Sequence, residues 1–119
     1  MVNNKKNNNA RNALRVVPRS DGFNFHTSPE CYIGVTSCSL EELANNIKEV
    51  CCDAIQYHFE RGDFQKWIRE TIGDCELAES IDDIKTCSRQ MSVECCRQEI
   101  AEIIRIRILQ LESNLMLLS

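Results

Sequence analysis

Apolar residues recur at helical spacing along most of the chain that follows Ser39. In the first such segment they stand mainly three or four positions apart, which is typical of an amphipathic helix with one face on a core. Ser39 and Glu42 form a capping box, in which the two side chains satisfy free backbone amides at a helix start. The pattern predicts a first helix over residues 40–51, whose apolar positions are Leu40, Leu43, Ala44, Ile47, Val50 and Cys51.

Two stop-and-start signals divide the segment that follows. Gly62 and Gly73 can each take the left-handed conformation that ends a helix. Asp63 and Asp74, which come directly after them, can each cap the next helix. We therefore predict a second helix over residues 53–61 and further helices after each glycine.

The helices on either side of Gly73 carry apolar stripes of their own. The third helix places Trp67, the only tryptophan, among apolar residues on one face, so we expect this side chain to anchor the core. A short fourth helix follows, and Ser80 with Asp83 three positions later predicts that another turn begins there. The apolar residues of these two helices are Phe64, Ile68, Ile72, Leu77, Ala78 and Ile81.

A long C-terminal helix is predicted over residues 93–117. Ser92 can cap its start, and neither proline nor glycine interrupts it. Its first turns are apolar enough to dock the helix on the body of the domain; the residues are Val93, Cys96, Ile100 and Ile103.

The distal part of this helix has the spacing of a coiled-coil seam, with apolar residues alternately three and four positions apart. In that register Arg107 is at a g position and Glu112 at the following e position, so two parallel copies would pair them across the seam. We expect a homodimer on this ground; the alternative is that the stripe completes the core of a monomer. The apolar members of the predicted dimer interface are Ala101, Ile104, Ile108, Leu111, Leu115 and Leu118.

Residues 23–37 have a different pattern, with two short extended pieces broken at Ser28-Pro29. The residue before a proline is restricted to extended conformations, and the β-branched and aromatic residues nearby favour strands. We expect a short β-hairpin or an irregular extended segment here. The predicted fold class is mainly α: a small bundle of about four to six helices with a long C-terminal helix.

Composition fits one globular domain, because the chain has 119 residues, of which 43% are hydrophobic and 27% charged. The charge is uneven. Residues 1–20 hold five basic residues and no acid, whereas the rest holds nine basic and eighteen acidic residues. We therefore divide the chain into a basic polar arm over residues 1–22, too rich in asparagine to bury anything, and a helical domain over residues 23–119.

Three interpretations of the arm stay open. It can be a tail that docks weakly on its own acidic domain. It can follow the phosphate backbone of RNA, in which case the affinity falls with salt. Its apolar residues Leu14, Val16 and Val17 can instead dock on a protein as an extended ligand. The candidate nucleic-acid-binding residues are Lys5, Lys6, Arg11, Arg15 and Arg19.

The eight cysteines lack the close C-x-x-C pairs that structural zinc and iron–sulfur sites usually use. The adjacent pairs Cys51-Cys52 and Cys95-Cys96 would diverge by about 100° on a helix, so both members cannot easily face one metal ion. Residues 1–20 lack the pattern of a secretory leader, which argues against a disulfide framework. We expect the cysteines to act as small hydrophobic residues, and we expect no metal or cofactor.

His58 is the residue to consider as a general base, because carboxylates lie near it in the sequence. No nucleophile accompanies it at a definable spacing, so no catalytic residue is predicted. We expect His58 to pack under Trp67 and to hydrogen-bond a loop carbonyl. Charged residues near the helix junctions are expected to form a structural set of ion pairs, made of Arg61, Arg69, Asp63 and Asp74.

The run YHFERGDFQKWIRETIGDCELA, with the preceding YIGVTSCSLEELANNIKEV, resembles a small prokaryotic, largely archaeal family of domains of unknown function. The matching features are Y-H-F-x-R-G-D-F-x-x-W-I-R, I-G-D-x-x-L-A and the S-L-E-E-L helix start. The likeness spans about Phe23 to Leu111, and the paired cysteines depart from it. It implies a mostly helical intracellular domain and transfers no active site.

These observations favour a non-enzymatic protein-interaction or regulatory module that self-associates through its C-terminal helix. One alternative is a ribonucleoprotein- or ribosome-associated factor that binds RNA through the basic arm. A second alternative is a thiol-based metal or redox protein. No run of about 18 apolar residues could span a bilayer, so we expect a cytoplasmic protein whose partners are other protein chains and not a membrane.

Overall fold

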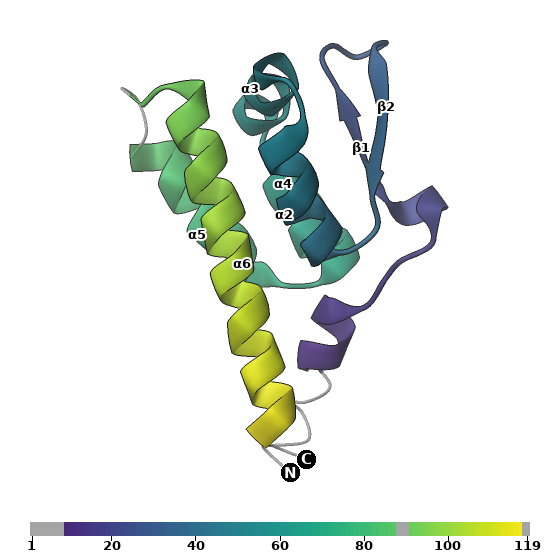
Figure 1. The fold of residues 1–119 in the computed structure, drawn as a ribbon, viewed down its shortest axis with the longest axis vertical. Coiled ribbons are helices and arrows are strands. Elements are labelled where there is room, and N and C mark those ends of the chain that lie inside the picture. Colours follow the sequence, from purple (N-terminus) through teal and green to yellow (C-terminus); the bar gives the residue numbers. More distant parts are fainter. Residues whose placement is uncertain (1–8, 88–90, 118–119) are drawn as a thin grey trace.

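The computed structural model describes residues 9–87 and 91–117 and is mainly helical, as the sequence predicts. A two-stranded antiparallel hairpin precedes the helical bundle (Figure 1). In chain order the elements are a helical turn at residues 9–14, η1 (Arg19–Asp21), β1 (Phe23–His26), β2 (Tyr32–Ser37), α2 (Leu40–Glu49), α3 (Cys52–Arg61), α4 (Asp63–Trp67), η2 (Ile68–Ile72), α5 (Cys75–Cys87) and α6 (Val93–Leu117).

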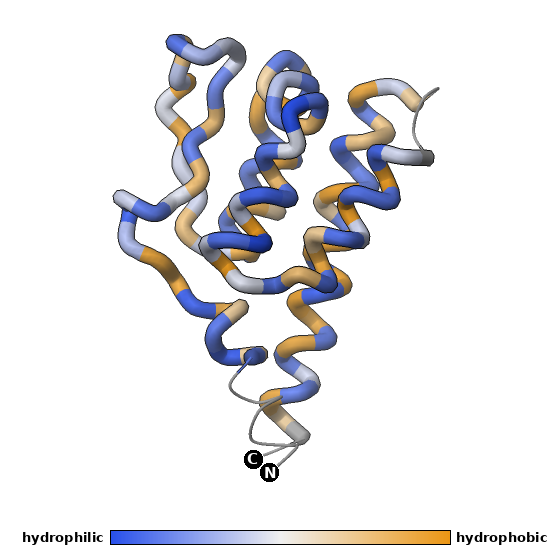
Figure 2. Tube along the Cα trace, turned by 180° about the vertical axis from the view of Figure 1, so that it is seen from behind, coloured by the Kyte–Doolittle hydropathy of each residue, from blue (hydrophilic) through white to orange (hydrophobic). Residues whose placement is uncertain are grey.

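The long helix α6 organises the bundle. With 25 residues it is about 37 Å long, and it packs most extensively on α2 and then on α5. The hairpin lies on the other side of the bundle, with β1 against α3. The lower end of α6 extends past α2 and α5, and the turn at residues 9–14 lies beside it in both views (Figures 1 and 2).

Strands β1 and β2 form the expected hairpin. They pair antiparallel with Phe23 opposite Ser37, and the register shifts between Asn24 and His26. Phe23 and Phe25 alternate with polar residues and point inward, with exposed fractions of 5% and 0%. The two rings lie edge to face with centroids 5.0 Å apart, so one face of the hairpin belongs to the core.

The helix caps at Ser39 and Ser92 are confirmed. The hydroxyl of Ser39 accepts a hydrogen bond from the amide of Glu42 at 3.1 Å, and the Glu42 carboxylate accepts one from the amide of Cys38 at 2.7 Å. At the start of α6, the hydroxyl of Ser92 accepts a hydrogen bond from the amide of Cys95 at 3.1 Å. Both arrangements satisfy amides that have no partner inside the helix.

The two predicted glycine stops are also confirmed, since Gly62 and Gly73 have φ angles of 74° and 86°. The turn before Gly73 is wider than predicted: Ile68–Ile72 is π-helical, and the Gly73 amide donates to the Ile68 carbonyl at 2.8 Å. The prediction of a new turn at Ser80 is wrong. Helix α5 continues from Cys75 to Cys87, and the Ser80 hydroxyl donates to a carbonyl within it.

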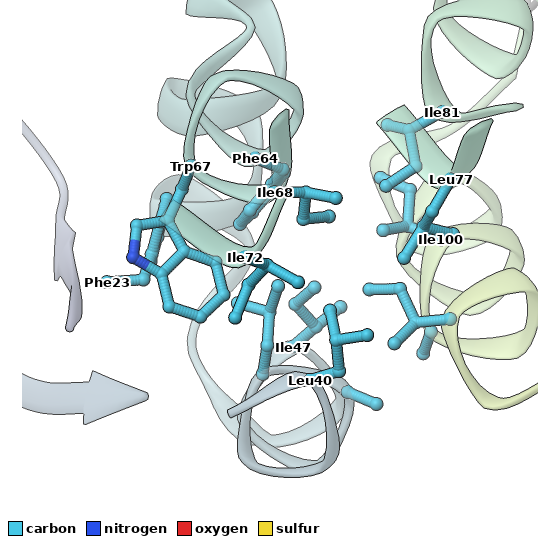
Figure 3. Packing of buried hydrophobic residues seen from close by; sticks show 14 of the residues in the cluster. Phe23, Leu40, Ile47, Phe64, Trp67, Ile68, Ile72, Leu77, Ile81 and Ile100 are labelled. Atoms are coloured by element: carbon cyan, nitrogen blue, oxygen red, sulfur yellow. The ribbon is translucent and has the colours of Figure 1, made fainter. Parts of the chain in front are cut away.

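The core fills the space between the hairpin, α2, the α4–η2 segment, α5 and α6 (Figure 3). Trp67 is 8% exposed, which confirms it as a core anchor, and its Nε1 donates to the carbonyl of Asp21 at 2.8 Å. The side chains labelled in Figure 3 are Phe23, Leu40, Ile47, Phe64, Trp67, Ile68, Ile72, Leu77, Ile81 and Ile100.

The second half of the basic arm belongs to this core. Ala10, Ala13 and Val17 have exposed fractions of 0%, 4% and 5%, so the expectation that the arm buries nothing is wrong for these residues. Arg15 fixes the segment, because its guanidinium donates to the carbonyls of Thr71 and Ile72 at 2.6 and 3.2 Å. These carbonyls end the π-helical turn, where no further helical amide follows to satisfy them.

We predict that Arg15→Met lowers the free energy of unfolding by about 1–2 kcal/mol, because charge-assisted hydrogen bonds to two carbonyls are lost. The substitution should also speed cleavage by thermolysin before Leu14, Val16 or Val17, since the segment then detaches more often. Urea titration and timed proteolysis measure the two effects. Arg11→Met, which changes an exposed residue of the same segment, serves as the control. Equal behaviour of the two variants would contradict the docking role of Arg15.

Candidate functional site

Helix α6 is held in one rotational setting by a buried ion pair with the start of α5. Asp74 is 5% exposed and accepts two hydrogen bonds from Arg107, at 2.8 Å to Nε and 3.2 Å to Nη2. The Asp74 carboxylate also accepts from the amide of Leu77 at 3.2 Å, so it caps α5. Glu76 adds an ion pair with Arg107 at 3.1 Å.

Electrostatics within this group favour the charged form of Arg107. Burial alone would lower the pKa of the guanidinium, but the hydrogen bond and negative charge of Asp74, helped by Glu76, outweigh it. The pKa of Arg107 is therefore raised above its ordinary value. A bidentate pair of this kind fixes direction as well as distance, and so sets which face of α6 points inward.

The residues of the predicted seam lie on that inward face. Ala101, Ile104 and Leu111 are 0%, 0% and 3% exposed and belong to the core of a single chain. Ile108 and Leu115 are partly buried against the same core. The stripe thus completes a monomer core, which was the alternative interpretation of its spacing.

The charged and terminal members of the predicted interface are placed differently. Arg107 is engaged by Asp74 and Glu76 of its own chain, so it is not available for the predicted pairing with Glu112 of a second copy. Glu112 is exposed, and Leu118 lies outside the described residues. Self-association stays a prediction, but the inward face of α6 does not provide its surface.

The opposite face of α6 carries the apolar side chains that are most open to solvent. Among the described residues, five large hydrophobic side chains are exposed, and three of them lie on distal α6: Ile106, Leu109 and Met116, at 47%, 63% and 77%. Figure 2 shows apolar positions continuing down this end of the helix. The sequence does contain a signal for this outer apolar stripe, since Leu109 and Met116 are seven positions apart. The inner stripe is more regular, however, and therefore dominates the pattern of apolar residues.

Shallow hollows lie on both sides of this outer face. The hollow toward α2 has a volume of about 230 Å³ and is lined by Glu41, Arg105, Ile108, Leu109 and Glu112. The hollow toward α5 has a volume of about 180 Å³ and is lined by Glu76, Leu77, Ser80, Ile103, Ile106, Arg107 and Gln110. Ile106 and Leu109 therefore form a ridge between two depressions, and this ridge with its flanks is the candidate interaction surface.

The candidate nucleic-acid-binding residues are not brought together into one patch. Lys5 and Lys6 lie outside the described residues. Arg11 and Arg19 are exposed, whereas Arg15 is committed to the carbonyls at the end of η2. Binding of RNA through the arm stays a prediction, with Arg15 placed for a structural role.

His58 has both ring nitrogens occupied. Its Nε2 lies 2.8 Å from the backbone nitrogen of His26, which can only donate, so Nε2 is the acceptor and Nδ1 carries the proton. Nδ1 donates to Asp63 at 2.8 Å, and Arg61 donates to the same carboxylate oxygen at 3.0 Å. The ring packs against Phe23 with centroids 4.7 Å apart, not under Trp67 as expected. A ring nitrogen without a free lone pair is poorly placed to act as a general base.

The expected set of ion pairs near the helix junctions is only partly confirmed. Arg61 pairs with Asp63, as expected from their proximity. Arg69, however, pairs with Asp82 at 3.2 Å, and Asp74 pairs with Arg107 from the distant helix α6. The long-range partners could not be identified from local spacing.

The cysteines that the structure describes as buried or exposed are all free thiols. Cys38 and Cys96 are buried, and the exposed free cysteines are Cys31, Cys51, Cys52, Cys75 and Cys95. Within residues 9–87 and 91–117, no three His, Cys, Asp or Glu side chains gather in a way that could hold a metal ion. In the same part of the chain, no helix is both long and apolar enough to cross a membrane.

We predict that His58 makes stability depend on pH. Burial lowers the pKa of His58 below 6.5, although Asp63 opposes the shift. Because the unfolded chain then binds the proton more readily, the stabilisation is complete above about pH 6.5, falls as the pH drops below it and levels off beneath the folded-state pKa. Denaturant titrations between about pH 5 and pH 8 measure it.

Two variants separate this effect from other titrations, since the chain has only two histidines. His58→Leu should flatten the decline below pH 6.5 and reduce stability at neutral pH by about 1–3 kcal/mol, because the His26 amide loses its acceptor. His26→Gln is the control and should keep the decline. A decline that persists in His58→Leu and disappears in His26→Gln would refute the assignment.

Comparison with known proteins places the chain in a family without revealing an activity. No curated protein and no solved structure matches the chain. A family model described as a family of unknown function matches residues 20–117, which covers every element from β1 to the end of α6. Since this match spans far more than half of the sequence, the protein belongs to the DUF5752 family, a family of unknown function.

Proposed function

We propose that this protein is a non-enzymatic protein-interaction or regulatory module that self-associates through the outer face of distal α6. The observation that carries the proposal is the ridge of Ile106 and Leu109, which are 47% and 63% exposed in an otherwise well-covered bundle. Burial of such side chains against another apolar surface is favourable by roughly 1.5–3 kcal/mol each. A polar helix face would offer no comparable driving force.

Further features support a binding role over catalysis. The buried histidine has no free ring nitrogen, as its bonds to His26 and Asp63 show. The hollow beside it, which is lined by residues that include Asn24, Tyr57 and Arg61, has a volume of about 370 Å³ and is polar and open. Small-molecule sites are typically more enclosed and apolar.

We propose that the module acts in the cytoplasm, and that its family is prokaryotic and largely archaeal, with the run from Tyr57 to Arg69 as a family motif. The partners are protein chains, the first of them a second copy. Purification of the native protein from cells with its bound partners, followed by mass spectrometry, tests for others.

We predict that Leu109→Asp weakens self-association by at least about a hundredfold, because it places a charge in the centre of the apolar contact. Sedimentation equilibrium or light scattering over a range of protein concentrations measures the effect. The fold should be retained, since the residue is 63% exposed in the single chain.

Val16→Asp is the matched control. Val16 is 71% exposed and equally apolar, but it is not on α6, so its substitution should leave the dissociation constant of the dimer unchanged. A wild-type protein that stays monomeric at every concentration would contradict the proposal. So would a dimer that Val16→Asp disrupts and Leu109→Asp leaves intact.

A further inference from the structure

We infer that the partner on the outer face of α6 is a second copy that lies antiparallel to the first, related to it by a two-fold axis. The inference rests on the proposed function and adds the orientation and register of the pair. The orientation is inferred from the charges of Arg105 and Glu112 and from the order of residues along the exposed face of α6.

Arg105 and Glu112 are two opposite charges beside the ridge without an ion pair in the described residues; Glu41 and Glu102 also lack one. Neither forms an ion pair within residues 9–87 and 91–117, although the other arginines of α6, Arg97 and Arg107, both do. Among the described residues, Arg105 donates to the side-chain amide oxygen of Asn45, and its buried Nε has no acceptor there. Both residues line the hollow on the α2 side of Leu109, together with Glu41, so the two opposite charges lie on the same side of the apolar ridge.

The exposed face follows a seven-residue pattern. Glu102 and Leu109 occupy one seam position, seven residues apart, and Ile106 and Ser113 occupy the other. Arg105 and Glu112 stand next to the seam at equivalent positions one heptad apart. In a pair of helices, each residue that flanks the seam contacts a flanking residue of the partner helix. Whether the helices are parallel or antiparallel decides which two flanking residues meet.

An antiparallel pair gives each of these four central positions a suitable partner. Ile106 of each copy faces Leu109 of the other, which forms two apolar layers at the centre. Glu102 then faces Ser113, whose hydroxyl can donate to the carboxylate. Arg105 lies beside Glu112 of the other copy, and the two-fold axis produces this ion pair twice.

A parallel pair is disfavoured by the same residues. Glu102 would face Glu102 of the second copy inside the seam, where like charges repel. Arg105 would lie beside Gln110, so neither unpaired charge would be neutralised. The charges therefore favour the antiparallel arrangement.

The shape of the surface agrees with this arrangement. The ridge of Ile106 and Leu109 has a hollow of about 230 Å³ on one side and one of about 180 Å³ on the other. A ridge beside a hollow is complementary to itself after a two-fold rotation, because each copy can place its ridge beside that of the other. An unrelated flat surface would leave the hollows unfilled.

Charge reversal tests the register. Arg105→Glu alone places two glutamates beside each other at both ends of the contact, and Glu112→Arg alone places two arginines there. Each variant should raise the dissociation constant of its own dimer about tenfold or more, since two ion pairs become two repulsions. An equimolar mixture of the two variants should restore wild-type affinity, because both pairs become attractive again in the mixed dimer.

Native mass spectrometry identifies the mixed dimer by its mass, and sedimentation equilibrium gives its affinity. Glu112 is exposed and has no ion pair in the described chain, so Glu112→Arg reports on assembly even if Arg105→Glu disturbs the contact with Asn45; thermal melts of both monomers check the fold. A mixed dimer as tight as wild type supports the antiparallel register. Reversals without effect on a dimer that Leu109→Asp disrupts would overturn the register and leave the proposed function standing. A monomeric wild type would overturn both.

Discussion

A buried ion pair between Asp74 and Arg107 is the constraint on which the interpretation of this fold depends. It joins the start of α5 to the middle of α6 with two hydrogen bonds at 2.8 and 3.2 Å, and it caps α5 through the amide of Leu77. Because the guanidinium is planar and both contacts are directional, α6 cannot rotate without leaving a buried charge unpaired. The pair therefore determines which residues of α6 meet the core and which meet solvent.

Each of the two faces of α6 then has its own role. The inner face contributes Ala101, Ile104 and Leu111 to a small core, whose stability margin is narrow in a domain of this size. Arm residues Ala10 and Ala13 add to that core. The outer face is left with an apolar ridge that nothing in the described chain covers, and the unpaired charges beside it suit a copy of the same helix.

Much of the fold could be predicted from local chemistry. The helix ends were predictable to within a few residues, because the signals that set them depend only on neighbours in sequence. These signals are the caps at Ser39 and Ser92 and the left-handed glycines Gly62 and Gly73. The π-helical turn before Gly73 was not, because it forms where Arg15, far away in the chain, donates to the carbonyls at its end. Long-range partners of this kind leave no periodic signal.

The same limit explains why the burial of the predicted seam residues Ala101, Ile104 and Leu111 in the core of a single chain was not foreseen. A heptad pattern shows that a stripe will be buried but not which surface buries it, and Arg107 could not be linked to Asp74 by spacing alone.

The most direct test of the account is methyl NMR of the wild-type protein at increasing concentration. The account predicts that the signals of Ile106 and Leu109 shift while those of Ile104 and Leu111 stay constant. Concentration-dependent shifts at Ile104 and Leu111 in place of the outer residues would contradict it.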